Sequence, residues 1–271
     1  MKRISLIFAA LLILLSMFAG CTKPQAPQED KSFDVIKEKG VFVMGLDDTF
    51  APMGFRDTAD NIVGFDVDMA TEVAKRWGVE LKLQPIDWSA KEQELNTKNI
   101  DCIWNGFSID ESRKENHTLT APYMDNNMAM VVRNEDNITS LEQLKGKKIG
   151  IQGGSSAVKA LDAAAEFKAE VEVIEFKDNA TALLDLETKG VDAVLMDDVV
   201  SRYYIDQSGK PLSVIDGTDN VIASEEYAVG LRKGEIQLRD ALEATLREMA
   251  ADGTLAQLST KWFGADVTKI K

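Results

Sequence analysis

Arg113 has neighbours in the sequence that suit the binding of an anion. It follows Gly106 by seven positions and Ser108 by five, in the stretch NGFSIDESR. An arginine can hold a carboxylate through two parallel hydrogen bonds, and the Gly106 amide and the Ser108 hydroxyl would add donors to the same anion. The spacing alone also permits a pairing of Arg113 with Asp110 or Glu111 on a solvated turn, and on spacing alone this second interpretation is favoured.

Further polar residues follow two other apolar stretches. Asp197 comes directly after VDAVLM, where a carboxylate could pair with an ammonium group, although acidic residues after a strand, such as Asp198, are often helix caps. The stretch IQGGSSAVKAL has the form of a strand, a small-residue turn and a helix start. Backbone N–H groups at a helix start favour an anion, and Ser155 and Ser156 suit an N-cap. Both stretches therefore predict polar groups at strand ends.

Two aromatic residues, Phe50 and Trp88, each come a few residues after an apolar stretch of strand length. Two rings that face one another form an apolar slot, and their negative faces favour a cation. Single aromatic residues are more often found in a core or at its rim. Both interpretations stay open at this point.

Apolar stretches of strand length alternate with helix-like patterns from residue 33 onward, which predicts parallel sheets of the βαβ type. The predicted strands are GVFVMGL, VELKLQPI, IDCIWNG, KKIGIQ, VEVIEF, VDAVLMD and EEYAVGLRKG. The predicted helices are VDMATEVAKRWG, SAKEQELNTKN, SSAVKALDAAAEFKA, NATALLDLETKG and two near the C-terminus that break at Gly253. Ligands of open α/β sheets bind beyond the carboxyl ends of the strands, and the candidate residues follow strands.

The chain contains an internal repeat. LNTKNIDCIWNG, which begins at Leu95, matches LETKGVDAVLMD 91 residues later, so that Asp101 corresponds to Asp192 and Gly106 to Asp197. A fainter similarity sets GVFVMGLD beside GKKIGIQG. The alternative is a coincidence between two ordinary helix-to-strand junctions. We predict two similar α/β halves whose strand ends face one cleft, a common place for ligands.

The last strand and helices have no sheet of their own, so we expect the chain to return to the first half. Two connecting segments would then join the halves, which suits a hinge. We predict a first lobe over residues 33–123 and 226–264, a second lobe over 124–225, and a C-terminal tail over 265–271.

The first residues have the form of an export signal. Two basic residues precede ISLIFAALLILLSMF, a run of about fifteen apolar residues that is shorter than the ~20 needed to cross a bilayer. FAGC then resembles the lipobox of bacterial lipoproteins, which implies lipid attachment at Cys21, although Phe18 stands where leucine is usual. The alternative is an ordinary, non-lipidated signal. We expect a signal peptide over residues 1–20 and a polar tether over 21–32.

The composition excludes some classes of function. The formal net charge is −14, and it becomes −16 without residues 1–20, which argues against a nucleic-acid partner. Besides Cys21 the sequence has one cysteine, Cys102, which we expect to be a core residue and not part of a disulfide framework. We expect neither a metal nor a cofactor.

Six motifs resemble, in order and spacing, those of the polar amino-acid substrate-binding proteins of bacterial ABC importers: DDTFAPMGF, GFDVDMATEVAKRWG, DWSAKEQELNTKNIDCIWNGFSIDESRKENHTLTAPYM, GIQGGSSA, VDAVLMDD and TKWFG. The resemblance spans residues 33–264. It implies an α/β fold of the periplasmic binding protein type II, with two Rossmann-like lobes joined by a two-strand hinge. It also implies a monomer that binds a free amino acid and delivers it to a membrane permease, held by the Cys21 lipid on the outer side of the cell membrane.

The resemblance implies roles for particular residues. Arg113 matches the arginine that holds the α-carboxylate of the ligand, assisted by Ser108 and, from the other lobe, by Ser156. Asp197 matches the acid that holds the α-ammonium group, with the Gly106 carbonyl as its helper.

Five further residues match positions around the ligand side chain. Phe50 and Trp88 match the aromatic pair, Asp47 and Gln152 match positions that distinguish side chains, and Met196 sits where relatives vary with ligand. Asp47 favours a cationic ligand, whereas Gln152, Trp88 and Met196 suit a neutral polar or sulfur-containing one.

Some proteins of this fold are enzymes, among them the periplasmic cyclohexadienyl dehydratases, and a periplasmic enzyme is the alternative. It would need an acid or base over the substrate. Asp47 or Asp48 could serve, whereas His117, the one histidine, is expected at the surface. Trp104 is bulkier than the residue of many relatives, and it either narrows the pocket or supports it from behind.

Overall fold

The computed structural model describes residues 29–271. The predicted signal peptide, residues 1–20, and the predicted lipidation site Cys21 lie outside the described residues. Within residues 29–271, every helix is too short or too polar to cross a lipid bilayer.

One ten-stranded mixed sheet has the order β10-β9-β11-β8-β13-β6-β1-β5, with β12 beside β8 and β7 beside β13. Its strands are β1 (Val41–Leu46), β5 (Glu80–Pro85), β6 (Cys102–Ser108), β7 (His117–Leu119), β8 (Met124–Arg133), β9 (Lys148–Gln152), β10 (Glu172–Phe176), β11 (Ala193–Asp197), β12 (Leu212–Val214) and β13 (Ala223–Arg232). A small second sheet contains β2 (Thr49–Phe50), β3 (Gly54–Arg56) and β4 (Ile62–Val63).

Helices connect these strands. They are α2 (Ser32–Lys39), α3 (Phe65–Trp77), α4 (Lys91–Asn96), α5 (Glu111–Asn116), α6 (Ser156–Ala163), α7 (Ala165–Ala169), α8 (Asn179–Glu187), α9 (Asp198–Ser208), α10 (Ile236–Ala251) and α11 (Thr254–Phe263). Short 3₁₀ turns occur at Trp88–Ala90, Asn134–Asp136, Leu141–Leu144 and Thr218–Asn220. The predicted strands and helices are present, except that SSAVKALDAAAEFKA forms two helices, α6 and α7, and not one. The sequence patterns assigned no element to α2, α5, α9, β8 or the short strands β2, β3, β4, β7 and β12.

Helix α3 shows how the sequence specifies such an element. Phe65, Met69 and Val73 recur every four residues and bury one face of the helix. Gly78 ends the helix in the left-handed conformation, and its N–H donates to the Ala74 carbonyl. The helix therefore presents one apolar face to the sheet and fixes the strands on either side of it.

Two groups of three parallel strands flank the centre of the sheet. In the first lobe β1 lies between β5 and β6, and in the second lobe β9 lies between β10 and β11. Cys102 pairs with Met44, and Ala193, 91 residues after Cys102, pairs with Ile149. The predicted repeat is thus a structural repeat. The fainter similarity was one residue out of register, because this pairing aligns Met44 with Ile149.

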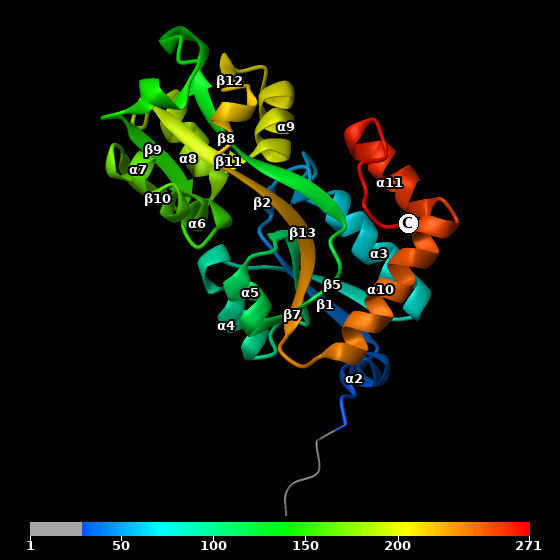
Figure 1. Cartoon of the computed structure of the whole chain (residues 1–271). Helices are drawn as coiled ribbons and strands as arrows, with labels where there is room; N and C mark the ends of the chain where they lie inside the picture. The colour runs from blue at the N-terminus through cyan, green and yellow to red at the C-terminus, as the bar shows by residue number, and fades with distance from the viewer. Residues whose placement is uncertain (1–28) are drawn as a thin grey trace, which may run out of the picture. The chain divides into compact units, whose positions relative to one another are not determined.

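Long strands β8 and β13 run between the two lobes (Figure 1). β8 pairs with β11, β13 pairs with β6, and the two are antiparallel to one another. The predicted lobe boundaries fall at the start of β8 and inside β13. Division of the chain at these residues stays a prediction.

Two arginines hold the corresponding helix-to-strand junctions of the repeat. Arg232, the last residue of β13, donates hydrogen bonds to the carbonyl groups of Leu95 (3.1 Å) and Ile100 (2.7 Å). Arg133, the last residue of β8, donates to the two carbonyl groups that lie 91 positions later, at 2.6 and 2.7 Å. Each crossing strand therefore ends by fixing the junction that precedes a site-bearing strand.

Asp101 and Asp192 also have equivalent contacts. The Asp101 carboxylate accepts hydrogen bonds from the Val43 N–H and from Lys39 Nζ, both at 2.7 Å. The Asp192 carboxylate accepts one from the Lys148 N–H at 2.9 Å. Each aspartate fixes the register of a parallel strand pair, but the Asp101 side chain is 7% exposed and that of Asp192 is 32% exposed.

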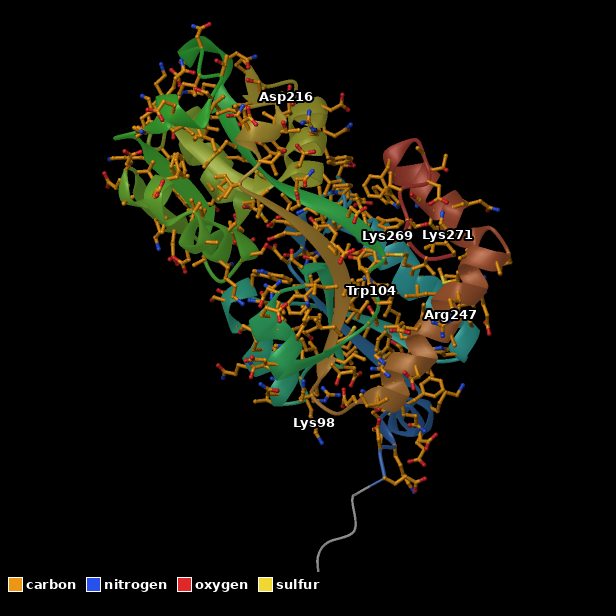
Figure 2. The ribbon with its side chains drawn as sticks, in the orientation of Figure 1. Lys98, Trp104, Asp216, Arg247, Lys269 and Lys271 are labelled. Carbon is orange, nitrogen blue, oxygen red and sulfur yellow. The ribbon has the colours of Figure 1, made fainter. Side chains whose placement is uncertain are left out.

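Three buried residues had specific expectations in the sequence analysis. Cys102 is fully buried, as predicted, and burial raises the pKa of its thiol well above the usual value. Trp104, labelled in Figure 2, is fully buried and packs near Tyr123, with ring centres 6.5 Å apart, so it supports the site from behind. The expectation of a surface His117 is wrong, because its ring is buried edge-on against Phe107.

We predict that Asp101→Ala lowers the melting temperature by roughly 3–10 °C, because a buried N–H of Val43 loses its partner at a cost of about 1–3 kcal/mol. Asp192→Ala is the matched control and should cost less than half as much, since water can reach the more exposed Lys148 N–H. Thermal unfolding of both variants measures the difference. Equal losses would contradict the burial argument.

Candidate functional site

A small cavity of about 10 Å³ lies at the ends of β6 and β11. The first lobe contributes Phe50, Trp88, Asn105, Gly106 and Arg113, and the second contributes Gln152, Ser155, Ser156 and Asp197. Seven of the ten predicted site residues are in this lining, and the other three, Asp47, Ser108 and Met196, are buried residues outside it. The cavity has space for about one water molecule, so the lobes lie close together at these strand ends.

Arg113 is held by its own helix and by the strand before it. Asp110 caps helix α5 by accepting the Arg113 N–H at 2.8 Å, and its carboxylate also lies 3.4 Å from Arg113 Nε. The guanidinium donates through Nη1 to the Ser108 carbonyl at 2.6 Å and lies 4.0 Å from the centre of the Phe107 ring. The pairing with Asp110 thus exists, but not on a solvated turn, because Arg113 is only 5% exposed.

Burial lowers the pKa of Arg113, and the charge of Asp110 opposes that shift. The guanidinium group stays protonated despite this lowering of its pKa. Its Nη2 donates no hydrogen bond to the part of the chain that the structure describes, so the fork retains donors for a further anion.

Asp197 is a buried carboxylate at the end of β11. Tyr227 Oη and Asn126 Nδ2 donate to the same oxygen, Oδ1, at 2.6 and 2.7 Å. Among residues 29–271, no cation forms an ion pair with Asp197. Burial raises its pKa to about 7, and the negative charge of Glu225 adds to that rise. A group that brings a positive charge to Asp197 would therefore stabilise its ionised form.

Gly106 is equivalent to Asp197 in the repeat, and its backbone is left-handed, with φ of 57°. A Cβ there would lie 2.8 Å from the Phe50 ring and 3.1 Å from the Tyr227 ring, so no side chain fits. The buried carboxylate of Asp66 accepts the Gly106 N–H at 2.8 Å. Because the N–H is engaged there, it is not the anion donor that the sequence suggested.

Asp47 and Gln152 contact each other across the lobes. Gln152 Nε2 donates to Asp47 Oδ2 at 2.7 Å, while Thr49 donates twice to Asp47 Oδ1, at 2.9 and 2.7 Å. Burial raises the pKa of Asp47. The two residues predicted to distinguish ligand side chains are thus hydrogen-bonded to one another.

Ser108 and Ser156 also meet across the lobes. Their hydroxyl oxygens lie 3.2 Å apart, with Ser108 at the end of β6 and Ser156 at the start of α6. Glu225 of β13 accepts a hydrogen bond from each of them, at 2.6 and 3.0 Å. Two further contacts join the lobes, from Lys159 to Asp110 at 2.7 Å and from Lys91 to the Gly154 carbonyl at 2.8 Å.

Met196 is the predicted residue whose position differs most from expectation. It is 1% exposed and belongs to the apolar core, not to the cavity lining. Sequence reasoning also missed four residues of the site: Asn105, Asn126, Glu225 and Tyr227. Asn105 could have been predicted from the sequence, because it directly precedes Gly106. The other three lie on β8 and β13, whose residues the sequence patterns did not connect with the site.

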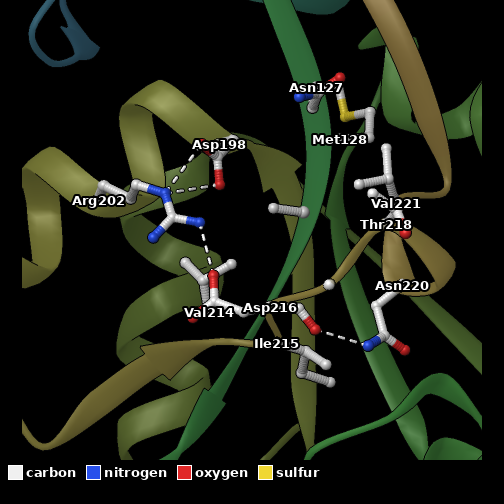
Figure 3. A pocket seen from close by; sticks show the side chains of 12 residues that line it. Asn127, Met128, Asp198, Arg202, Val214, Ile215, Asp216, Thr218, Asn220 and Val221 are labelled. Atoms are coloured by element: carbon white, nitrogen blue, oxygen red, sulfur yellow. Dashed lines mark hydrogen bonds and ion pairs between the residues drawn. The ribbon is translucent and has the colours of Figure 1, made fainter.

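Two wider depressions lie elsewhere, beside α9. Figure 3 shows one of them, where Arg202 donates to Asp198 and Asp216, each at 2.9 Å. The other continues from Asp198 and Arg202 towards Trp262. None of the ten predicted site residues lines either depression, and Arg202 is already neutralised by two carboxylates.

Comparison with known proteins places the chain in a family. The sequence profile described as "Bacterial extracellular solute-binding proteins, family 3" matches residues 42–265. The L-cystine-binding protein TcyJ of Escherichia coli strain K12 is 34% identical over 236 residues, which cover 86% of each chain.

Solved structures agree with the sequence relatives. The substrate-binding protein of an ABC uptake transporter from Streptococcus pneumoniae, with bound histidine, superposes with a TM-score of 0.85 at 32% identity and covers 90% of this chain and 100% of that one. AncCDT-1, an ancestral amino acid-binding protein and precursor of cyclohexadienyl dehydratase, superposes with a TM-score of 0.77 at 29% identity, over 86% and 99% of the chains. The predicted two-lobed α/β fold is confirmed, and the chain belongs to the bacterial extracellular solute-binding proteins of family 3.

Proposed function

We propose that this chain captures a free polar amino acid in the cavity between β6 and β11 and delivers it to the permease of an ABC importer. One observation carries the proposal: Arg113 and Asp197, two buried groups of opposite charge, line the same small cavity. An α-amino acid carries a carboxylate and an ammonium group on one carbon. It can therefore satisfy both groups at once, whereas a simple cation or anion satisfies only one.

Closure of the lobes follows from the same division of contacts. Arg113 and Ser108 belong to the first lobe, and Ser156 and Asp197 to the second. A ligand that needs both sets of contacts is bound best when the lobes are together, so it shifts the population towards the closed form. Exclusion of water from the closed cavity strengthens each charged hydrogen bond. The permease would recognise this closed, loaded form.

The comparisons support an amino acid as the ligand. TcyJ is named for L-cystine, and the Streptococcus pneumoniae structure holds histidine. The ligand screen therefore contains the twenty amino acids, cystine, ornithine and citrulline, with thermal shift as the readout, because a ligand stabilises by RT ln(1 + [L]/Kd). Conversion of prephenate and arogenate is assayed alongside, because AncCDT-1, which shares this fold, is a precursor of the enzyme cyclohexadienyl dehydratase.

We also propose that the protein is a monomer, is exported by residues 1–20 and is held on the outer face of the cell membrane by a lipid on Cys21. The motif FAGC supports the anchor, and the polar residues that follow would give the binding unit reach.

We predict that Arg113→Lys weakens binding of the amino acid found in the screen by about 10- to 150-fold. Lysine keeps the charge but loses the second arm of the fork, and hydrogen bonds between charged groups are each worth about 1.5–3 kcal/mol. Isothermal titration calorimetry measures the change. Lys114→Met, one position along on the exposed side of α5, is the control and should bind as the wild type does. Undiminished binding by Arg113→Lys would refute the clamp.

We predict that Asp197→Asn abolishes binding yet raises the melting temperature of the ligand-free protein at pH 8 by roughly 2–6 °C. The folded pKa of about 7 lies above the usual 3.8, so the wild type loses stability as the pH rises from about 3.8 to about 7, and the loss is complete at pH 8. The gain should shrink at pH 5, where Asp197 is protonated. For the same reason, wild-type affinity should fall as pH drops below 7.

Thermal unfolding and calorimetry at both pH values test this. Asp66 also has a pKa raised to about 7 by burial, but it is present in both proteins and cancels in the comparison. A gain that is the same at pH 5 and pH 8 would mean that the charge of Asp197 is not its cause.

We predict that Cys21→Ala moves the protein from the membrane fraction to the soluble extracellular fraction, because no acceptor thiol remains for the lipid. Fractionation of expressing cells and an immunoblot measure it. Cys102→Ala is the control and should stay with the membrane. A membrane-bound Cys21→Ala variant would exclude the anchor.

A further inference from the structure

Glu225 lies where the proposed ligand carboxylate has its contacts. Its Oε2 accepts hydrogen bonds from Ser108 Oγ at 2.6 Å and from Ser156 Oγ at 3.0 Å. Ser108 belongs to the first lobe, Ser156 to the second, and Glu225 to the crossing strand β13. One carboxylate thus joins both lobes through a single oxygen.

A count of protons shows the consequence. A serine hydroxyl has one proton to donate. Ser108 and Ser156 cannot donate to Glu225 and to a ligand carboxylate at the same time. The two carboxylates therefore compete for the same donors.

The charge of Glu225 also acts on Arg113 and Asp197 as the charge of a ligand carboxylate would. The negative charge of Glu225 stabilises the charge of Arg113 and raises the pKa of Asp197, as a ligand carboxylate between them would. Glu225 is only half-buried, so its side chain has access to solvent when it leaves the serines. The next residue on the strand, Glu226, pairs instead with Lys269.

We propose that Glu225 is an internal surrogate for the ligand carboxylate, which links the two lobes through Ser108 and Ser156 until a ligand displaces it. This inference rests on the proposed function. The surrogate satisfies the two hydroxyl groups and favours closure without a ligand. Each ligand must then break these bonds, so Glu225 lowers the affinity and sets the concentration at which the protein loads.

The test uses the full chain with Glu225→Ala and Glu225→Gln. Removal of the competing carboxylate should tighten binding of the amino acid by about 5- to 50-fold in the alanine variant, since the bonds lost by the ligand-free form are charge-assisted. The glutamine variant keeps an acceptor oxygen without the charge and should fall between alanine and wild type. Glu226→Gln, on the same strand but paired with Lys269, is the control and should leave the affinity unchanged.

A second measurement does not need the ligand. Fluorescence energy transfer between a dye on each lobe should show a smaller closed fraction for ligand-free Glu225→Ala than for the wild type. In a Ser156→Ala background the effect of Glu225→Ala should shrink, because Glu225 then has only one hydroxyl to hold.

The outcomes separate the two proposals. Unchanged or weaker binding by Glu225→Ala would overturn the surrogate while leaving the amino-acid site in place. If the wild type binds no amino acid of the screen, the proposed function fails. The closed fraction still decides on Glu225 in that case, and an unchanged fraction would overturn the link between the lobes.

Discussion

The burial of a carboxyl group that forms no ion pair within residues 29–271 is the constraint on which the site depends. Asp197 is 5% exposed and receives hydrogen bonds only from neutral groups, Tyr227 and Asn126. Neutral donors and the nearby charge of Arg113 offset part of the cost of burial, but burial still raises the pKa of Asp197 to about 7. Asp197 therefore reduces the stability of the empty protein and favours any ligand that brings a positive charge. The instability of the site and its affinity have the same cause.

The groups that hold this carboxylate also connect the two lobes. Tyr227 lies on β13 and Asn126 on β8, the two strands that cross between the lobes. Movement at the crossing strands must therefore change the surroundings of Asp197. Conversely, a ligand that fixes Asp197 restrains the strands about which the lobes would turn. In the proposed mechanism, these two hydrogen bonds couple ligand binding to closure of the lobes.

Sequence patterns could predict the features that depend on residues close to one another along the chain. The strands, the repeat and the residues at strand ends follow from apolar periodicity. Arg113 was predicted as a site residue only through the resemblance to the family, because its spacing alone favoured a solvated turn. Met196, which directly precedes Asp197 on β11, is buried in the core, and its predicted role near the ligand side chain stays a prediction. Glu225 could not have been found in this way. Its partners lie 117 and 69 positions away, and only the return of β13 to the first lobe brings them together.

Tyr227 explains why the two equivalent strand ends of the repeat carry different residues. Its ring would lie 3.1 Å from any Cβ at Gly106, and its hydroxyl donates to Asp197 at 2.6 Å. One side chain from β13 thus requires a glycine at the end of β6 and supports a carboxylate at the end of β11. Two carboxylates at these equivalent ends would present like charges to the cavity. The proposed ligand, with opposite charges on one carbon, needs unlike ends, and Tyr227 of β13 contacts both of them.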